Sequence, residues 1–208
     1  MDRYVTPHLA AYREYVGRRE MTLDERLAEE RILFLWGEIS SSLHWGSAGS
    51  TIMRMLELQA KQADHDINLY INSPGGAVDD TLALYDTIQF LSCDVATYCV
   101  GQAASGAAMI LAAGTKGKRF ALPHSKIMIH QPWGGVTGQA TDIQIQAEEI
   151  LKAKRLLNEL FAKHTGRTPE QVAEETERDR YLTAQEAVEY GIVDEILETA
   201  AQTAPKKD

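Results

Sequence analysis

Segments with the pattern of a strand alternate with segments with the pattern of a helix along this chain. Residues 67–72 alternate apolar and polar side chains as a strand does, and residues 81–91 place leucine and isoleucine at helical spacing. The same order returns in residues 95–100 and 107–113. Parallel strands need a crossover connection, which is usually a helix, so this alternation predicts βα units around a mainly parallel sheet. We therefore expect an α/β fold, with its longest helix over residues 141–163.

Composition narrows the class of protein. The 208 residues include 30 acidic and 21 basic side chains, which give a formal net charge of -9, and an acidic surface repels the phosphates of nucleic acids. No apolar run approaches the roughly 18 residues that span a bilayer, and the N-terminus lacks the apolar region of a signal peptide. Cys93 and Cys99 are too few for a disulfide framework. These features predict a single-domain cytoplasmic protein that binds neither nucleic acid nor membrane.

A glycine turn, Ser-Pro-Gly-Gly at residues 73–76, lies between a predicted strand and a predicted helix. Such a turn is either a simple tight turn or a place where free backbone N–H groups hold a developing oxyanion. Asp79 and Asp80 follow at once and would repel a phosphate, and the chain has neither a GxGxxG motif nor a P-loop. Nucleotide binding is therefore not supported, and the other two interpretations stay open.

Ser105 follows the second predicted strand and is surrounded by glycine and alanine. Small neighbours leave room around its hydroxyl, as a nucleophile needs, but a serine in front of a helix is also a common N-cap. Ala103 and Ala107 stand where the Gly-x-Ser-x-Gly motif has glycine, which argues against the nucleophile turn of an α/β-hydrolase.

His130 ends a predicted strand over residues 126–130, where a general base is well placed at the edge of a sheet. A single histidine is nevertheless more often structural, and His124 does not have the spacing of a zinc partner. Asp179 lies in a charged stretch, and spacing alone does not raise it above Glu175 or Glu177. The residues by themselves thus suggest a serine, a base and an oxyanion turn, but no unique acid.

Seven blocks of this chain resemble the proteolytic subunit of the Clp protease (ClpP), in the order that this family has them. The blocks are Tyr70–Gly76 (YINSPGG), Tyr85–Phe90 (YDTIQF), Gly101–Ser105 (GQAAS), Lys116–Phe120 (KGKRF), Met128–Pro132 (MIHQP), Gly138–Asp142 (GQATD) and Glu177–Tyr181 (ERDRY). The similarity runs from about Arg26 to Leu197. Seven blocks in order with family-like spacing are specific for this family.

The resemblance implies a serine endopeptidase with Ser105 as nucleophile, His130 as general base and acid, and Asp179 as the group that orients His130. It places the oxyanion on the backbone N–H groups of Gly76 and Gly106. The family usually has methionine and then glycine after the nucleophile, whereas this chain has Gly106 and Ala107. We expect this change to alter the preference for substrate residues or to slow turnover.

The same resemblance implies a crotonase-like spiral of βα units over residues 26–197, with a protruding handle at about 134–163. A segment at 1–25 that differs from the family precedes this peptidase domain, and a flexible tail at 198–208 follows it. The handle helix carries an apolar stripe, which periodicity alone would also permit in a core helix. The members of the stripe are Ile143, Ala147, Ile150, Leu157 and Phe161, and Lys154 interrupts it.

The family further implies partners. Handles stack two seven-membered rings of this chain, or of this chain and a paralogue, and an AAA+ unfoldase of the Clp type feeds unfolded proteins into the chamber. Tyr70 and Phe90 match aromatic residues that line the cleft where the ATPase docks. The chain itself needs no cofactor or metal, because ATP binds the partner.

Two other functions remain as alternatives at this point. An acyl-CoA hydratase or isomerase would share the crotonase-like fold and its oxyanion turn. A structural ring subunit paired with an active paralogue would fit the unusual N-terminus and Gly106, although a complete set of Ser105, His130 and Asp179 argues against it.

Overall fold

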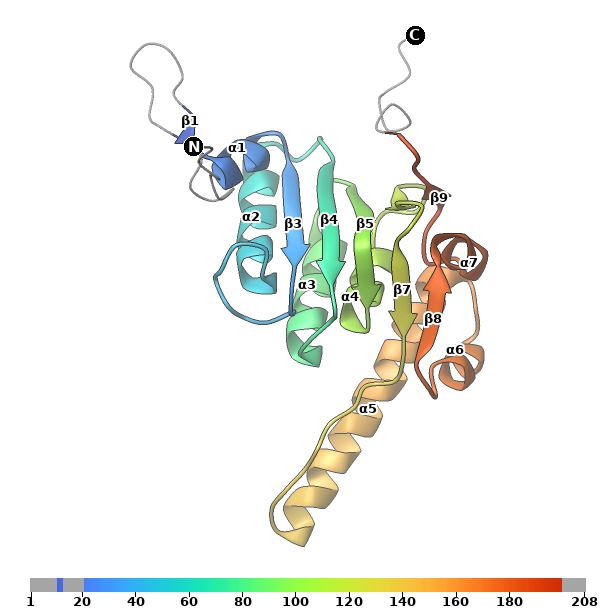
Figure 1. The fold of residues 1–208 in the computed structure, drawn as a ribbon. Coiled ribbons are helices and arrows are strands. Elements are labelled where there is room, and N and C mark those ends of the chain that lie inside the picture. The colour runs from blue at the N-terminus through green and yellow to red at the C-terminus, as the bar shows by residue number, and fades with distance from the viewer. Residues whose placement is uncertain (1–10, 13–20, 200–208) are drawn as a thin grey trace, which may run out of the picture.

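A seven-stranded sheet forms the centre of the fold in the computed structural model, which describes residues 11–12 and 21–199. Its strands are β3 (Ile32–Trp36), β4 (Ile67–Ser73), β5 (Val95–Ala104), β6 (Arg119–Ala121), β7 (Lys126–Ile129), β8 (Arg180–Thr183) and β9 (Glu195–Ile196). They run in the order β3-β4-β5-β6-β9, with β7 beside β5 and β8 beside β7 (Figure 1). All these pairs are parallel except β7 with β8. The predicted α/β fold with a mainly parallel sheet is confirmed.

The helices occupy the segments where apolar residues recur at helical spacing. They are α1 (Leu23–Glu29), α2 (Ala48–Lys61), α3 (Val78–Phe90), α4 (Gly106–Ala112), α5 (Ala140–Thr165), α6 (Pro169–Glu175) and α7 (Ala184–Tyr190). A short pair, β1 (Ala11–Tyr12) and β2 (Met21–Thr22), precedes them. The capping box that Thr183 and Glu186 suggest is present at the start of α7. No helix in the described part of the chain is both long and apolar enough to cross a membrane.

The core lies on one face of the sheet. Alternate residues of β4, Ile67, Leu69 and Ile71, are fully buried, and Leu84 of α3 and Ile110 of α4 are equally buried in the same cluster. The intervening residues of β4 point to the other face and are only half-buried. The helices α2, α3 and α4 lie behind the sheet in Figure 1. This arrangement explains the period-two pattern of β4, because among the described residues helices cover only one of its faces.

Strand β5 bends and divides the sheet. Its first half pairs with β6 through Thr97–Cys99, and its end pairs with β7 through Gln102–Ala104. Between them the register with β4 shifts, and Gly101 has a φ of 90°, a conformation that glycine adopts at no steric cost. The bend directs the end of β5 toward β7, so that the residues following both strands lie close together.

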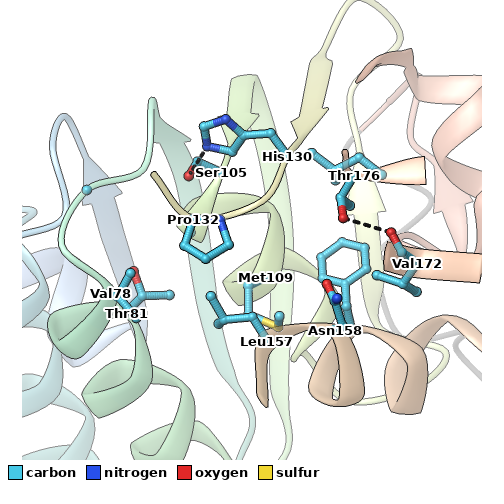
Figure 2. A pocket seen from close by; sticks show the side chains of 14 residues that line it. Val78, Thr81, Ser105, Met109, His130, Pro132, Leu157, Asn158, Val172 and Thr176 are labelled. Atoms are coloured by element: carbon cyan, nitrogen blue, oxygen red, sulfur yellow. Dashed lines mark hydrogen bonds between the residues drawn. The ribbon is translucent and has the colours of Figure 1, made fainter. Parts of the chain in front are cut away.

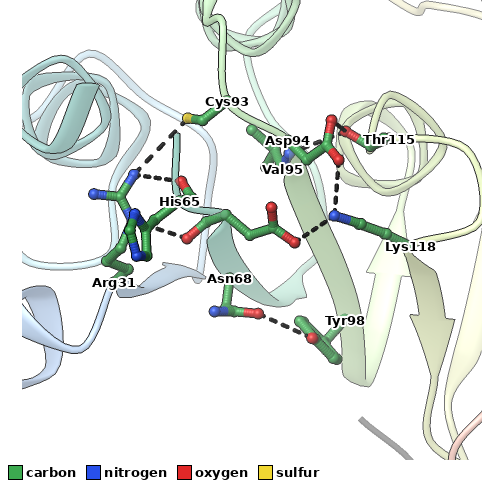
Figure 3. A network of polar contacts seen from close by, with 10 residues as sticks. Arg31, His65, Asn68, Cys93, Asp94, Val95, Tyr98, Thr115 and Lys118 are labelled. Atoms are coloured by element: carbon green, nitrogen blue, oxygen red, sulfur yellow. Dashed lines mark hydrogen bonds and ion pairs between the residues drawn. The ribbon is translucent and has the colours of Figure 1, made fainter. Parts of the chain in front are cut away.

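Hydrogen bonds and ion pairs of polar side chains connect the segments at the amino-terminal end of the strands (Figure 3). The buried guanidinium of Arg31 donates hydrogen bonds to the backbone oxygens of Leu58, His65 and Asp66. The ammonium group of Lys118 bonds the carboxylates of Asp66 and Asp94 at 2.5 and 2.7 Å. These contacts join the start of β3 to the connections that lead into β4, β5 and β6.

Helix α5 extends well beyond the sheet (Figure 1). Only its C-terminal part is buried in this chain, at Asn158, Phe161 and Ala162. The exposed apolar residues of its remaining turns are Ile143, Ile145, Leu151 and Leu156. Of the predicted stripe, Ile143 and Ala147 are exposed, Ile150 and Leu157 are partly buried, and Phe161 is buried. The stripe is therefore covered toward the C-terminal end of α5, and Ile145, Leu151 and Leu156 lie off it. Most of the predicted segment 1–25 and of the predicted tail 198–208 lies outside the described residues, and those boundaries stay predictions.

Candidate active site

Ser105 lies at the sharp turn between β5 and α4. Its φ of 57° and ψ of -125° are unusual for a residue other than glycine. Such a backbone conformation is unfavourable by about 1–3 kcal/mol, and the surrounding contacts must offset this free energy. Its N–H donates to the oxygen of Met128 in β7 at 2.8 Å. Although Ser105 occupies the N-cap position of α4, its side chain makes no capping hydrogen bond. The hydroxyl is therefore available for another partner, although the chain lacks the Gly-x-Ser-x-Gly motif.

The glycine turn at residues 73–76 packs directly against Ser105. A Cβ on Gly75, whose φ is 91°, would lie 2.7 Å from both the Ser105 Cβ and the Ala104 oxygen. A Cβ on Gly76 would overlap the backbone of Ile39. Position 75 therefore requires glycine because Ser105 lies so close, and position 76 requires glycine because Ile39, in the segment that follows β3, lies so close.

Gly76 and Gly106 both line the cavity beside Ser105. The bridge between Gly76 and Ile39 uses the Gly75 oxygen and the Ala77 N–H, so the N–H of Gly76 itself points away from Ile39. Gly106 is the first residue of α4, where a helix has no internal acceptor for its N–H. Within the described residues neither amide is hydrogen-bonded to another group, and both can donate to an anion beside Ser105.

His130 follows β7 directly and lies between Ser105 and Asp179. Its Nε2 is 2.8 Å from the Ser105 Oγ, and its Nδ1 is 3.2 Å from the Asp179 Oδ1. The imidazole is mostly buried, whereas the carboxylate of Asp179 is 58% exposed. With the proton on Nδ1, His130 donates to Asp179 and accepts the hydroxyl proton of Ser105 at Nε2.

The pairing of β7 with β8 explains why Asp179 reaches His130. Ile129, the last residue of β7, pairs with Arg180, the first residue of the antiparallel strand β8. The residue after β7 and the residue before β8 must therefore lie side by side. The two other acids that sequence left open have different partners: Glu175 bonds Arg167 and Arg180, and Glu177 bonds Lys154. Of the three, Asp179 is the one beside the imidazole.

A cavity of about 60 Å³ opens beneath the serine and the histidine (Figure 2). Val78 and Thr81 of α3 form one side of it, and Asn158 of α5 with Val172 of α6 forms the other. None of its lining residues is Asp, Glu, Lys or Arg. Thr81 and Asn158 could not be predicted as lining residues, because the sequence of an amphipathic helix does not show whether a polar residue faces water or a cavity. Among the described residues, no group of three His, Cys, Asp or Glu side chains could hold a metal ion.

Tyr70 and Phe90 occupy different surfaces. Tyr70 stacks between Phe34 and Tyr98 on the sheet face that turns away from the core helices, with ring centroids 5.7 and 4.6 Å away. Phe90 ends α3 and is 78% exposed. No ring contact joins Tyr70 to Phe90 in the described part of the chain.

Comparison with known proteins identifies the family. A family model described as Clp protease matches residues 16–200. The chain belongs to the Clp protease family. ATP-dependent Clp protease proteolytic subunit 1 of Rhodopirellula baltica is 53% identical over 188 residues, which are 90% of this chain and 81% of that protein. The family match extends beyond residues 26–197, over which the sequence blocks indicated the resemblance.

Membership in the Clp protease family settles the fold and the enzyme class. The chain is a serine peptidase with a crotonase-like α/β fold, as the seven sequence blocks predicted. The alternative of an acyl-CoA hydratase or isomerase is set aside, because the match covers most of the chain and names a protease.

Proposed function

We propose that this chain cleaves peptide bonds of unfolded proteins with Ser105, His130 and Asp179 as its catalytic triad. The observation that carries this proposal is the hydrogen-bonded series from Ser105 Oγ to His130 Nε2, at 2.8 Å, and from His130 Nδ1 to Asp179 Oδ1, at 3.2 Å. Both distances are within the range over which a nucleophile, its base and an orienting group cooperate.

The reaction follows from this order of groups. His130 Nε2 takes the hydroxyl proton as Ser105 Oγ bonds to the substrate carbonyl carbon, and the carbonyl oxygen becomes negative. The same proton then passes to the departing amine, and an acyl-enzyme remains. Water then attacks the ester carbonyl carbon and gives a proton to His130 Nε2. His130 passes this proton to Ser105 Oγ as the acyl C–O bond breaks, which releases the carboxylic acid and restores Ser105. Asp179 holds the imidazole in the required tautomer and stabilises its positive charge.

Gly76 and Gly106 supply the oxyanion site in this mechanism. Both glycines line the cavity beside Ser105, and their N–H groups have no acceptor within the described residues. Because Gly76 is held in a bridge with Ile39 and Gly106 is the first residue of α4, the two donors would already be in place when charge develops on the carbonyl oxygen.

Assembly and partners are a further part of the proposal. Two seven-membered rings of this chain, with or without a paralogue, would stack through α5 and enclose the active sites in the cytoplasm. A Clp-type AAA+ ATPase would unfold substrates and bind the ATP, with Tyr70 and Phe90 at its docking cleft. The exposed apolar side chains of α5 support the stacking, and the name of the Rhodopirellula protein, an ATP-dependent subunit, supports both assembly and partner. Because Tyr70 and Phe90 lie on different surfaces of one copy, the cleft would form between neighbouring subunits.

Fluorophosphonate labelling with peptide mapping tests the proposed nucleophile. We expect an adduct on Ser105, and we expect Ser105→Ala to lose at least about 10³-fold in peptidase activity. Ser92→Ala is the control, because Ser92 is an exposed serine whose hydroxyl bonds Gln59 rather than His130. An assembled wild-type protein without an adduct and without peptidase activity would instead identify a structural ring subunit.

A further inference from the structure

Thr81 occupies the space that a side chain at position 106 would need. It is 1% exposed, lies in the first turns of α3 and donates its hydroxyl proton to the Ala77 oxygen at 2.9 Å. A Cβ built on Gly106 would overlap the Thr81 Oγ1 and would lie 3.1 Å from its Cγ2 and 3.3 Å from its Cβ. Gly106 stands where the family usually has methionine. In this chain, therefore, the side chain that bounds the cavity next to Ser105 is Thr81 of α3, because Gly106 has no side chain.

We propose that Thr81 determines which substrate side chain is accepted at P1, the residue whose carbonyl Ser105 attacks. This inference rests on the proposed peptidase function. The P1 side chain is attached to the Cα next to the attacked carbonyl carbon, and the cavity lined by Thr81, Ser105 and Gly106 lies beside that position. Thr81 narrows this cavity on the side nearest Gly106. The volume of the Thr81 side chain therefore limits the size of the P1 side chain that the cavity accepts.

The cavity predicts a small or mid-sized aliphatic residue at P1. Its volume of about 60 Å³ is less than half of the roughly 150 Å³ that accommodates a benzene ring in an engineered apolar cavity. An aromatic side chain therefore does not fit without displacing Thr81. A charged side chain is also disfavoured, because no Asp, Glu, Lys or Arg lines the cavity to compensate the lost hydration.

A series of fluorogenic peptides that differ only at P1, with alanine, leucine, phenylalanine, tryptophan or glutamate, tests the proposal. For the wild-type protein we expect kcat/KM for leucine to exceed that for phenylalanine by at least about 10-fold, since misfit in an apolar pocket is worth roughly 10–200-fold per methylene. Thr81→Ala removes the Oγ1 and the Cγ2, and should lower this leucine-to-phenylalanine ratio by about 10-fold. Thr81→Ser retains the hydroxyl and should give an intermediate ratio.

The control variants distinguish an effect of the Thr81 side chain on the cavity from a general effect on helix α3. Thr87 is also on α3 and also donates its hydroxyl proton to the carbonyl four residues earlier, but it does not line the cavity. Thr87→Ala should therefore leave the leucine-to-phenylalanine ratio unchanged. Gly106→Ala alone should lower kcat/KM by about 10-fold or more because of the overlap with Thr81. Combining it with Thr81→Ala should restore most of the activity, since of the three nearest contacts only the one to the Thr81 Cβ, at 3.3 Å, then remains.

The outcomes distinguish this inference from the proposed function. An active wild-type enzyme whose ratio stays the same in Thr81→Ala and Thr81→Ser overturns the assignment of Thr81 and leaves the triad intact. A wild-type preference for phenylalanine overturns it as well. Failure of Ser105 to react with fluorophosphonate would overturn the proposed function itself.

Discussion

The imidazole of His164 shows how burial controls the charge of a single residue. It lies in the last turn of α5, and its Nε2 is 2.8 Å from the hydroxyl of Tyr85 on α3. Burial, together with the nearby charges of Lys163 and Arg119, lowers the pKa of His164 to about 4. The ring is therefore neutral at pH 7 and can accept the Tyr85 proton, which joins α5 to α3.

This shifted pKa predicts how stability depends on pH. In the unfolded chain a histidine gains a proton near its ordinary pKa of about 6.5, whereas folded His164 does not until about pH 4. The unfolded state therefore binds more protons in this window, and stability falls as the pH is lowered from 6.5 toward 4. We expect about 1 kcal/mol at pH 5 after allowance for partial exposure, or roughly 2–4 °C in Tm.

Calorimetry at pH 7.5 and pH 5 on the wild type and on His164→Gln measures this effect. The difference in Tm between the two pH values should be smaller in the variant, because glutamine does not titrate. An equal drop in both proteins would show that other groups cause the acid sensitivity.

Helix α5 is also connected to the active site through one side chain. Lys154, which interrupts the apolar stripe, bonds the Gln131 Oε1 at 2.7 Å and the Glu177 Oε2 at 3.1 Å. Its hydrogen bond and charge hold the pKa of the Glu177 carboxyl below its usual value. Gln131 follows His130, and Glu177 lies two residues before Asp179, so Lys154 joins the segments that carry the proposed base and its proposed orienting group. We regard Lys154 as a positioning residue.

Replacing Lys154 should therefore lower kcat without weakening substrate binding. For Lys154→Met we expect a decrease in kcat of about 10-fold with KM within twofold, because the segment of Asp179 loses its connection to α5. Lys152→Met is the matched control, since Lys152 is exposed and pairs with Glu149 within the same helix. Steady-state kinetics on both variants decide the matter, and equal effects would refute a role specific to Lys154.

At the scale of the whole molecule, most of helix α5 carries apolar side chains that the described part of the chain leaves exposed. Ile145 and Leu151 on α5 are 54% and 53% exposed, far more than core residues of the sheet. Exposed apolar side chains along one projecting helix are typical of a surface that pairs with another copy. If α5 stacks two rings, charges placed on it should separate the rings while each ring stays intact.

Native mass spectrometry measures this directly. The wild type should have about fourteen times the monomer mass, and Ile145→Glu combined with Leu151→Glu should reduce it to about half, because buried unpaired carboxylates are costly. Leu43→Glu is the control: Leu43 is 70% exposed but lies outside α5, and its replacement should leave the mass unchanged. A wild-type monomer at micromolar concentration would contradict stacking through α5.

Much of the fold could be predicted from local pattern. The strand at β4, the helices α3 and α5 and the capping box at Thr183 all follow from spacing that reflects burial of one face. The turn of Ser105 could not, because its motif lacks the usual glycines and its φ of 57° is imposed by contacts with β7 and the glycine turn. The residues of β5 likewise give no sign that the strand divides between β6 and β7.

The sequence by itself determined the order of strands and helices, the family, and the candidate serine and histidine, because these depend on residues that are neighbours along the chain. Spacing alone left Asp179 level with Glu175 and Glu177, and the family resemblance named it. The tertiary structure shows why it reaches His130, since the antiparallel register of β7 and β8 is a contact between segments about fifty residues apart. The same holds for Thr81 and Gly106, which share one small volume because α3 packs against α4. The periodicity of apolar residues in the sequence indicates which side chains are buried, and the packing of helices and strands determines which residues they contact.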